Sequence, residues 1–280
     1  MMGIVERVSI AFEERHHALE ASAKAFTTAH VMAHGHDESD AFARRITHEM
    51  GAAGLLDAGV ALDVRGICLA REAIAYGSGL ADSMLALQGL GYGPIALGGT
   101  DAQRAEWKPR VTSGTAIAAI AITEPEAGSD VGGMTTRATK SGDGWVLSGK
   151  KCFITNAGIA DFYCVFARTS DEKSRSISAF LVPAEKVRLI ERYALVAPHP
   201  CGEIAFDDVA LPADALIGRE GEGLKLALGT LDRFRSTVGA ASIGMAQRAL
   251  DEAIERALGL SLIHISEPTR LRRISYAVFC

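Results

Sequence analysis

The chain of 280 residues lacks the features that would place it at once in several large classes of protein. Its five cysteines (Cys68, Cys152, Cys164, Cys201 and Cys280) form no C-x-x-C pair and match no zinc-ligand spacing, so we expect no metal site. Scattered cysteines of this kind are usually reduced, which predicts a cytoplasmic protein. No stretch approaches the roughly 18 consecutive apolar residues of a membrane span. The formal net charge of −5 offers no excess of positive charge for binding a nucleic acid.

The sequence does contain two changes of hydrophobic period. Residues 1–116 carry apolar side chains at three- and four-residue spacing, interrupted by glycines, which predicts an N-terminal helical domain. Residues 117–212 show short apolar runs separated by proline and glycine, with a tight-turn signal at Asp143-Gly144, which predicts a central antiparallel β-barrel. Helical spacing resumes over residues 213–259. We therefore expect an α+β protein of several domains, ending in the start of a C-terminal helical domain.

The last stretch of the chain, residues 260–280, keeps no helical period. Its segments LSLIHISEPTR and ISYAVFC resemble the in-frame translation of a sequencing-library adapter, and the three residues between them fit a short index. We therefore expect a non-native tail, excluded from arguments about the fold, and a natural protein that continues beyond residue 259. The alternative is a natural basic tail.

The stretch AITEPEAGSD, residues 121–130, places three carboxylates in ten residues. Pro125 disfavours helix at the residue before it, and Gly128 allows a tight turn. Such a segment displays backbone N–H groups and the hydroxyls of Thr123 and Ser129, which suits a flat, hydrogen-bonding ligand. The spacing of its oxygens does not match a calcium-binding loop. On composition alone, an ordinary solvated turn remains the alternative.

Four segments resemble the acyl-CoA dehydrogenase family, in the family's order, and the resemblance covers about residues 1–259. They are AITEPEAGSDVGG (121–133), GKKCFITNAG (149–158), DDVALPADALIG (207–218) and LDRFRSTVGAASIGMAQRALDEA (231–253). The resemblance implies a helical domain, a β-barrel and a four-helix bundle, which agrees with the order found from periodicity. It also implies an FAD-dependent oxidoreductase of acyl-CoA catabolism, which removes an α proton and transfers a β hydride to the flavin.

The resemblance further implies the partners and the binding residues. The expected partners are an acyl-CoA substrate, an electron-transferring flavoprotein as acceptor, and further copies of the same chain in a dimer or tetramer. The expected FAD-binding residues are Ile120, Ala121, Ile122, Thr123, Gly128, Ser129, Phe153, Ile154 and Thr155. The expected acyl-CoA-binding residues are Ser129, Asp232 and Arg235. Phe153 stands where the family usually has tryptophan, which keeps an aromatic face but loses the indole N–H.

No catalytic base is assigned in this chain. Glu124 and Glu126 are expected to shape the turn and to be solvated, and Asp130 to cap the backbone that follows it. In most of the family the base is a glutamate late in the C-terminal domain, which would lie beyond residue 259. A minority place it on the first long C-terminal helix, where this chain has Phe234. We therefore expect the natural protein to be active and this chain to be inactive.

Three alternatives remain. A flavin monooxygenase or oxidase on the same fold would lack the CoA-binding set of Ser129, Asp232 and Arg235. A non-catalytic paralogue that binds acyl-CoA or flavin would keep that set and lack the base. A chain with an unfinished bundle would expose the apolar face of residues 231–258 and bind nothing tightly.

Overall fold

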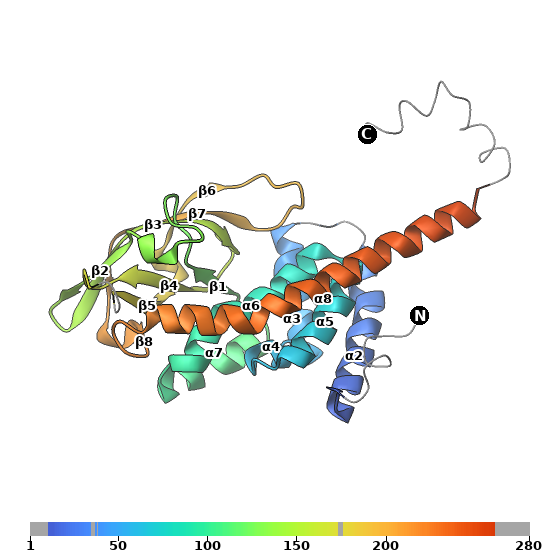
Figure 1. Ribbon diagram of the computed structural model, residues 1–280, viewed down its shortest axis with the longest axis horizontal. Helices are drawn as coiled ribbons and strands as arrows, with labels where there is room; N and C mark the ends of the chain where they lie inside the picture. The colour runs from blue at the N-terminus through green and yellow to red at the C-terminus, as the bar shows by residue number, and fades with distance from the viewer. Residues whose placement is uncertain (1–10, 35–36, 38, 173–175, 261–280) are drawn as a thin grey trace, which may run out of the picture.

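The computed structural model describes residues 11–34, 37, 39–172 and 176–260. A helical domain is followed by a β-sheet domain and then by one long helix, in the order predicted (Figure 1). The predicted tail lies outside the described residues, apart from Leu260. In the described part of the chain, no helix combines the length and the apolar character needed to cross a membrane.

The helical domain consists of short helices capped by polar side chains. Ser39, Asp63, Ser78 and Thr100 each accept a hydrogen bond from the backbone N–H three residues later, which fixes where four of the helices begin. The elements are α2 (Glu14–Phe26), η2 (Thr27–Val31), η3 (Met32–His34), α3 (Asp40–Ala52), α4 (Asp57–Val60), α5 (Val64–Gly77), α6 (Gly79–Gly98) and α7 (Asp101–Thr112).

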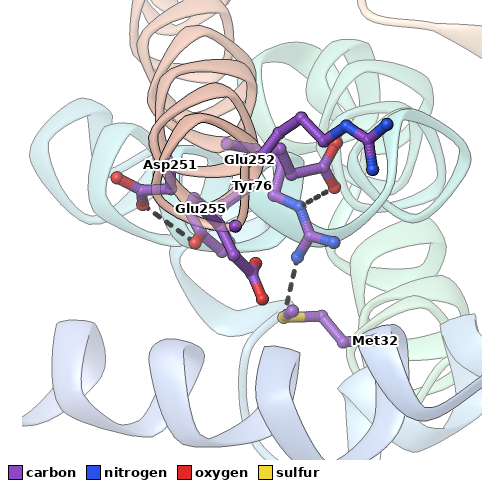
Figure 2. Close-up of a pocket in the computed structure, with 8 residues that line it drawn as sticks. Met32, Tyr76, Asp251, Glu252 and Glu255 are labelled. Atoms are coloured by element: carbon purple, nitrogen blue, oxygen red, sulfur yellow. Dashed lines mark hydrogen bonds and ion pairs between the residues drawn. The ribbon is translucent and has the colours of Figure 1, made fainter. Parts of the chain in front are cut away.

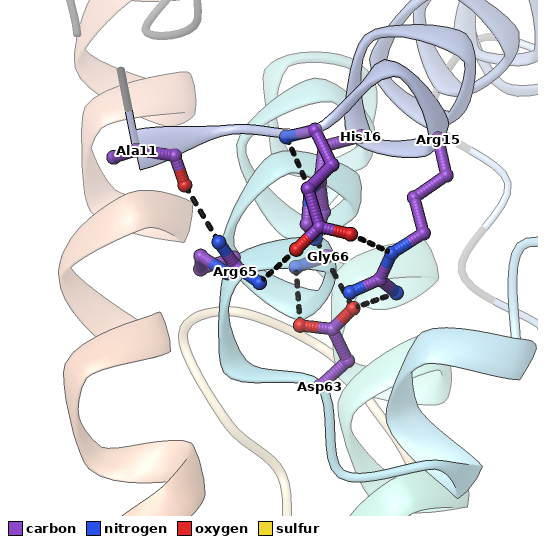
Figure 3. Close-up of polar contacts among 7 residues, drawn as sticks. Ala11, Arg15, His16, Asp63, Arg65 and Gly66 are labelled. Atoms are coloured by element: carbon purple, nitrogen blue, oxygen red, sulfur yellow. Dashed lines mark hydrogen bonds and ion pairs between the residues drawn. The ribbon is translucent and has the colours of Figure 1, made fainter. Parts of the chain in front are cut away.

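A network of polar side chains ties the start of α2 to the start of α5 (Figure 3). Glu13 accepts hydrogen bonds from Arg15 at 2.8 Å and Arg65 at 2.6 Å. Arg15 also donates to Asp63 at 2.6 Å. The buried His16 accepts a bond from the backbone N–H of Glu13 at its Nδ1, so its Nε2 carries the proton and donates to Asp63 at 3.2 Å. The network therefore orders the chain's first described turn.

The sheet has eight strands in the order β6-β7-β3-β2-β4-β5-β8, with β1 paired to β4. The strands are β1 (Ala118–Ala121), β2 (Arg137–Ser141), β3 (Gly144–Thr155), β4 (Phe162–Arg168), β5 (Ile177–Pro183), β6 (Arg188–Arg192), β7 (Cys201–Leu211) and β8 (Leu216–Ile217). β2 and β3 form a hairpin around the predicted tight turn, and Ser141 pairs with Gly144. β8 lies beyond the predicted end of this region at residue 212.

The prediction of an antiparallel barrel was wrong in two respects. β1 and β2 each run parallel to β4, so the sheet is mixed. Among the described residues the sheet also does not close, because the ordered path ends at β6 on one side and β8 on the other. A parallel pair needs a long connection between its strands, and the loop and hairpin between β1 and β4 supply one.

Helix α8 (Gly223–Leu258) starts against β5 and crosses α6 and α5 (Figure 1). Its buried residues all lie between Gly223 and Gly244. Gly244 permits the closest approach, because a Cβ there would collide with the backbone carbonyl of Glu72. The distal part projects past the helical domain, and large apolar side chains such as Leu250 and Leu258 are exposed on it. These exposed side chains belong to the apolar face of residues 231–258 that the unfinished-bundle alternative describes.

A polar hollow of about 590 Å³ lies where this distal part passes α5 (Figure 2). Tyr76 donates from its hydroxyl to the Asp251 carboxylate at 3.0 Å. Arg248 pairs with Glu252 at 2.6 Å and reaches the sulfur of Met32 at 3.5 Å. These contacts hold the part of α8 around Arg248 and Asp251 against the helical domain, before the helix projects past it.

Candidate functional site

The two segments expected to hold the flavin lie side by side, at the ends of β1 and β3. The backbone N–H of Cys152 donates to the carbonyl of Thr123 at 3.0 Å. Beside it, the Lys151 ammonium donates to the carbonyl of Ile122 at 2.8 Å. Since these bonds join neighbouring points on both segments, residues 120–123 and 151–155 are held side by side, with Phe153 exposed and Ala121, Cys152 and Ile154 buried.

The first residue of β1, Ala118, is held by two buried side-chain amides. The Gln88 carbonyl oxygen accepts from its N–H at 2.8 Å, and the Asn156 amide donates to its carbonyl at 2.9 Å. Gln88 also donates to the carbonyls of Val111 and Ala116. Sequence analysis missed both residues, although a glutamine inside the apolar run of α6 was a visible signal. Because Gln88 is bonded through both the oxygen and the nitrogen of its amide, it fixes where β1 starts.

An aromatic ring stands exposed at the end of β3. Phe153 is 66% exposed and has a positive φ of 55°, which turns it away from the sheet. The ring of Tyr193 lies 5.0 Å from it, between ring centroids. Thr155, two residues later, is half-buried and lies opposite Cys201 of β7 in the sheet. Burial raises the pKa of the Cys201 thiol.

The loop after β1 is built on a buried ion pair. Glu124 is 3% exposed and lies 2.8 Å from the Lys151 ammonium, whose side chain is fully buried. The expectation that Glu124 would be solvated was therefore wrong, whereas Glu126 is exposed as predicted. Asp130 makes no side-chain cap to the short helix that follows it, which contradicts its predicted role. A carboxylate in a turn looks solvated in sequence, because its partner lies 27 positions away.

Charge and burial act in opposite directions on this pair. Burial alone raises the pKa of Glu124, but the Lys151 charge and the donors on Thr135 and Thr136 overcome it and lower the pKa to about 2. Burial lowers the pKa of Lys151 to about 8, opposed by the carboxylate. Both groups are therefore charged at neutral pH.

The tip of the loop presents unused hydrogen-bond donors. Gly128 and Ser129 are exposed, and no described residue accepts a hydrogen bond from either backbone N–H. A Cβ at Gly128 would meet nothing within 4 Å, so the space beside it is open. The same segment also carries the hydroxyls of Thr123 and Ser129. This arrangement suits a ligand rich in oxygen and nitrogen acceptors.

Of the three residues expected to bind CoA, Asp232 and Arg235 lie together on α8, whereas Ser129 lies apart from them in sequence, on the loop after β1. Asp232 and Arg235 form an ion pair at 3.7 Å on α8, with side chains 67% and 72% exposed. Asp232 lines a hollow of about 680 Å³ together with Lys225. In the described part of the chain, Ser129 makes no hydrogen bond with Asp232 or Arg235. Phe234, which lies between Asp232 and Arg235 in the sequence, is buried, and its ring packs against Gly89 of α6.

Metal chemistry receives no support from the side chains. No group of three or more histidine, cysteine, aspartate or glutamate side chains converges as a metal site among the residues described. His30, for example, stacks on Phe26 and lies 3.2 Å from the Glu49 carboxylate.

Comparison with known proteins identifies the family. The model of the acyl-CoA dehydrogenase N-terminal domain matches residues 13–115, and that of the middle domain matches residues 119–209. The chain therefore belongs to the acyl-CoA dehydrogenase family.

Individual relatives agree with this assignment. A protein named as a probable acyl-CoA dehydrogenase from Mycobacterium leprae is 33% identical over 86% of this chain and 66% of its own. Butyryl-CoA dehydrogenase from Megasphaera elsdenii has a TM-score of 0.80 at 27% identity, over 95% of this chain and 74% of that chain.

A third similar protein was solved with a bound flavin. It is a glutaryl-CoA dehydrogenase from Mycobacterium smegmatis in complex with FADH2, with a TM-score of 0.78 at 28% identity, over 88% of this chain and 66% of that chain. Among the curated relatives that it matches, the chain spans between 49% and 66% of their length.

Proposed function

We propose that this chain supplies the FAD-binding and acyl-CoA-binding surface of an enzyme that dehydrogenates an acyl-CoA thioester between its α and β carbons. The observation that carries the proposal is that hydrogen bonds to Thr123 and Ile122 hold the two segments together, with the exposed Phe153 on one and the exposed loop of Gly128 and Ser129 continuing the other. Family membership supports it independently.

The residues present fit FAD by the chemistry of their donors. The isoalloxazine ring is flat and carries several acceptors, which matches free backbone N–H groups at Gly128 and Ser129 beside the hydroxyl of Thr123. Phe153 offers an aromatic face, and Thr155 offers a hydroxyl on the same strand end. The remaining residues proposed to line the cofactor are Ile120, Ala121, Ile122 and Ile154.

When bound, FAD supplies the acceptor for the hydride that leaves the β carbon. The accompanying α proton needs a base, and the acids of this loop do not fit that role. Glu124 already bonds Lys151, and its pKa of about 2 makes its carboxylate a weak base. Phe234 carries no ionisable group. We therefore propose that no described residue of this site is the base, and that its residues act by binding and orientation.

Ser129, Asp232 and Arg235 are proposed to bind the acyl-CoA. Arg235 is exposed, so its guanidinium could exchange the 3.7 Å ion pair with Asp232 for a phosphate of the nucleotide end, and Ser129 would contact the pantetheine arm. An electron-transferring flavoprotein as the electron acceptor and a homo-oligomeric state belong to the same proposal, as do domain limits near residues 116 and 212.

Binding measurements on the purified chain test the proposal. We expect FAD to bind with quenching of its fluorescence, and the loaded protein to bind a short acyl-CoA thioester. Arg235→Ala should weaken acyl-CoA binding by about tenfold, equivalent to about 1.4 kcal/mol. Arg256→Ala, an exposed arginine in the distal part of the same helix, is the matched control.

The outcomes separate the alternatives. Absence of FAD binding contradicts the proposal. FAD binding without any affinity for acyl-CoA favours the oxidase or monooxygenase. A non-catalytic paralogue would bind both ligands, but would leave the flavin oxidised when an acyl-CoA is added to the natural full-length protein without oxygen.

A further inference from the structure

The loop between β1 and β2 begins and ends at the same buried ion pair. On the entry side, the Lys151 ammonium donates to the carbonyl of Ile122 at 2.8 Å and to the Glu124 carboxylate at 2.8 Å. On the exit side, the same carboxylate accepts from the backbone N–H groups of Thr135, at 2.6 Å, and Thr136, at 3.0 Å. The pair therefore fastens both ends of the loop to β3, the strand that carries Lys151.

The carboxylate of Glu124 has no hydrogen-bonding capacity left. One oxygen accepts from the N–H and, at 2.8 Å, the hydroxyl of Thr135, and the other accepts from Thr136 and Lys151. A carboxylate offers about four acceptor sites, and all are used here. Glu124 therefore holds its neighbours in place and has no site left for a substrate proton.

The residues enclosed by these bonds form a tight turn. Glu124 and Ala127 exchange two backbone hydrogen bonds, each of 3.1 Å. This turn leads directly to Gly128 and Ser129, whose backbone N–H groups donate to no described residue. The position of those donors relative to Thr123 is thus set by a turn that is itself fixed at Glu124.

We propose that Glu124 and Lys151 are positioning residues for the flavin. The buried pair fixes the loop so that the donors of Thr123, Gly128 and Ser129 stand ready before FAD arrives. This inference rests on the proposed function, since it assigns the loop to that cofactor. A pre-ordered loop binds more tightly, because the entropy of ordering it is not lost on binding.

The choice of an ion pair over apolar side chains follows from the same contacts. Well-packed apolar residues often stabilise a protein as much as a buried ion pair does. Apolar side chains here would leave the N–H groups of Thr135 and Thr136 and the carbonyl of Ile122 without their partners. The charged pair satisfies groups from three parts of the chain at once, and so specifies a single loop conformation.

The test compares two neutralised ion pairs. Glu124→Gln with Lys151→Met removes the pair in the loop without leaving a lone buried charge. Arg71→Met with Asp82→Asn does the same to the buried pair between α5 and α6, whose side-chain hydrogen bonds involve Thr237 but no described residue of the loop. For each protein, FAD affinity is measured by fluorescence quenching at a temperature where circular dichroism shows it folded. The visible absorption spectrum of the bound flavin is recorded as a second readout.

We expect the loop variant to weaken FAD binding by about tenfold or more and to alter the spectrum of the bound flavin, while the helix variant stays within about twofold of the wild type. A loop variant that is folded and binds FAD with unchanged affinity and spectrum would overturn the inference. Equal weakening in both variants would also overturn it, because the effect would then be one of general stability. If the wild type itself binds no FAD, the proposed function fails first, which distinguishes the two failures.

A milder variant covers the case in which the loop variant does not fold. Thr135→Val removes one of the four donors from an exposed position, so the core is untouched. FAD binding should weaken by about threefold, or about 0.6 kcal/mol. Unchanged binding in this variant would count against the inference.

Discussion

Two buried ion pairs, one in the helical domain and one in the sheet domain, hold different kinds of structure in place. Arg71 and Asp82 join α5 to α6, with hydrogen bonds of 2.8 and 2.6 Å between the guanidinium and the carboxylate. Glu124 and Lys151 lie in the sheet domain and are buried more completely. The helix pair connects regular elements, whereas the loop pair organises irregular backbone.

The partners of the two carboxylates differ most. Among the described residues, Asp82 accepts side-chain hydrogen bonds from Arg71 alone. Glu124 keeps two backbone N–H donors and one hydroxyl in addition to its lysine. The free energy lost on breaking a buried ion pair can therefore differ greatly between the two pairs. It depends on which hydrogen bonds the remaining buried charge keeps.

The largest effect should follow Arg71→Met. This change leaves the Asp82 carboxylate buried without a partner and should destabilise the protein by about 3–5 kcal/mol. Urea unfolding followed by circular dichroism measures the loss. Arg65→Met on the same helix is the control, since Arg65 pairs with Glu13 at the surface and should cost no more than about 1 kcal/mol. Equal losses in both variants would contradict the importance of burial.

Lys151→Met should cost less, at about 2–3 kcal/mol, because Glu124 retains three donors after the lysine is gone. The neighbouring Lys150 is exposed, so Lys150→Met serves as the control and should change stability little. The same urea unfolding experiment shows which of Lys151→Met and Arg71→Met loses more free energy of unfolding. A greater loss for Lys151→Met than for Arg71→Met would show that the donors on the loop do not compensate for the missing charge.

The structure also shows which features the sequence predicts and which it does not. The order of helices and strands follows from periodicity, since each element carries its own pattern of three, four or two. Strand direction does not, because an alternating pattern is the same for parallel and antiparallel neighbours. The parallel pairing of Ala118–Ala121 with β4 was therefore out of reach.

The candidate site likewise has features that the sequence predicts and features that it does not. Its two segments were located by their resemblance to a family, and the structure places them together at Thr123 and Cys152. The ligand contacts assigned to them remain predictions. Gln88 and the burial of Glu124 were missed, because hydrogen bonds between distant residues leave no local pattern. A glutamine within the apolar run of α6 is the clearest signal of such a bond.

Acid should weaken the loop pair in a defined window. The carboxyl of Glu124 has a pKa of about 2 in the folded chain against an ordinary 4.5, so the unfolded chain binds more protons between these values. Its contribution to stability is complete well above pH 4.5 and is lost as the pH falls through that value toward 2, with about 0.8 kcal/mol gone at pH 4. Glu124→Gln should remove this part of the slope, while Glu126→Gln, at an exposed glutamate, should keep it. Identical slopes in the wild type and Glu124→Gln would contradict the low pKa.

The smallest effects come from single hydroxyls on the two pairs. Thr237 is fully buried, accepts from Arg71 at 2.9 Å and donates to the carbonyl of Phe234 at 2.7 Å. Thr237→Val should cost about 1 kcal/mol, because both partners stay buried and lose a bond. Thr135→Val removes a hydroxyl from Glu124 at an exposed residue, where water replaces it, and should cost about 0.5 kcal/mol. If Thr135→Val instead lowered the free energy of unfolding more than Thr237→Val, the loop pair would be more sensitive to the loss of a hydroxyl than the helix pair, despite its extra donors.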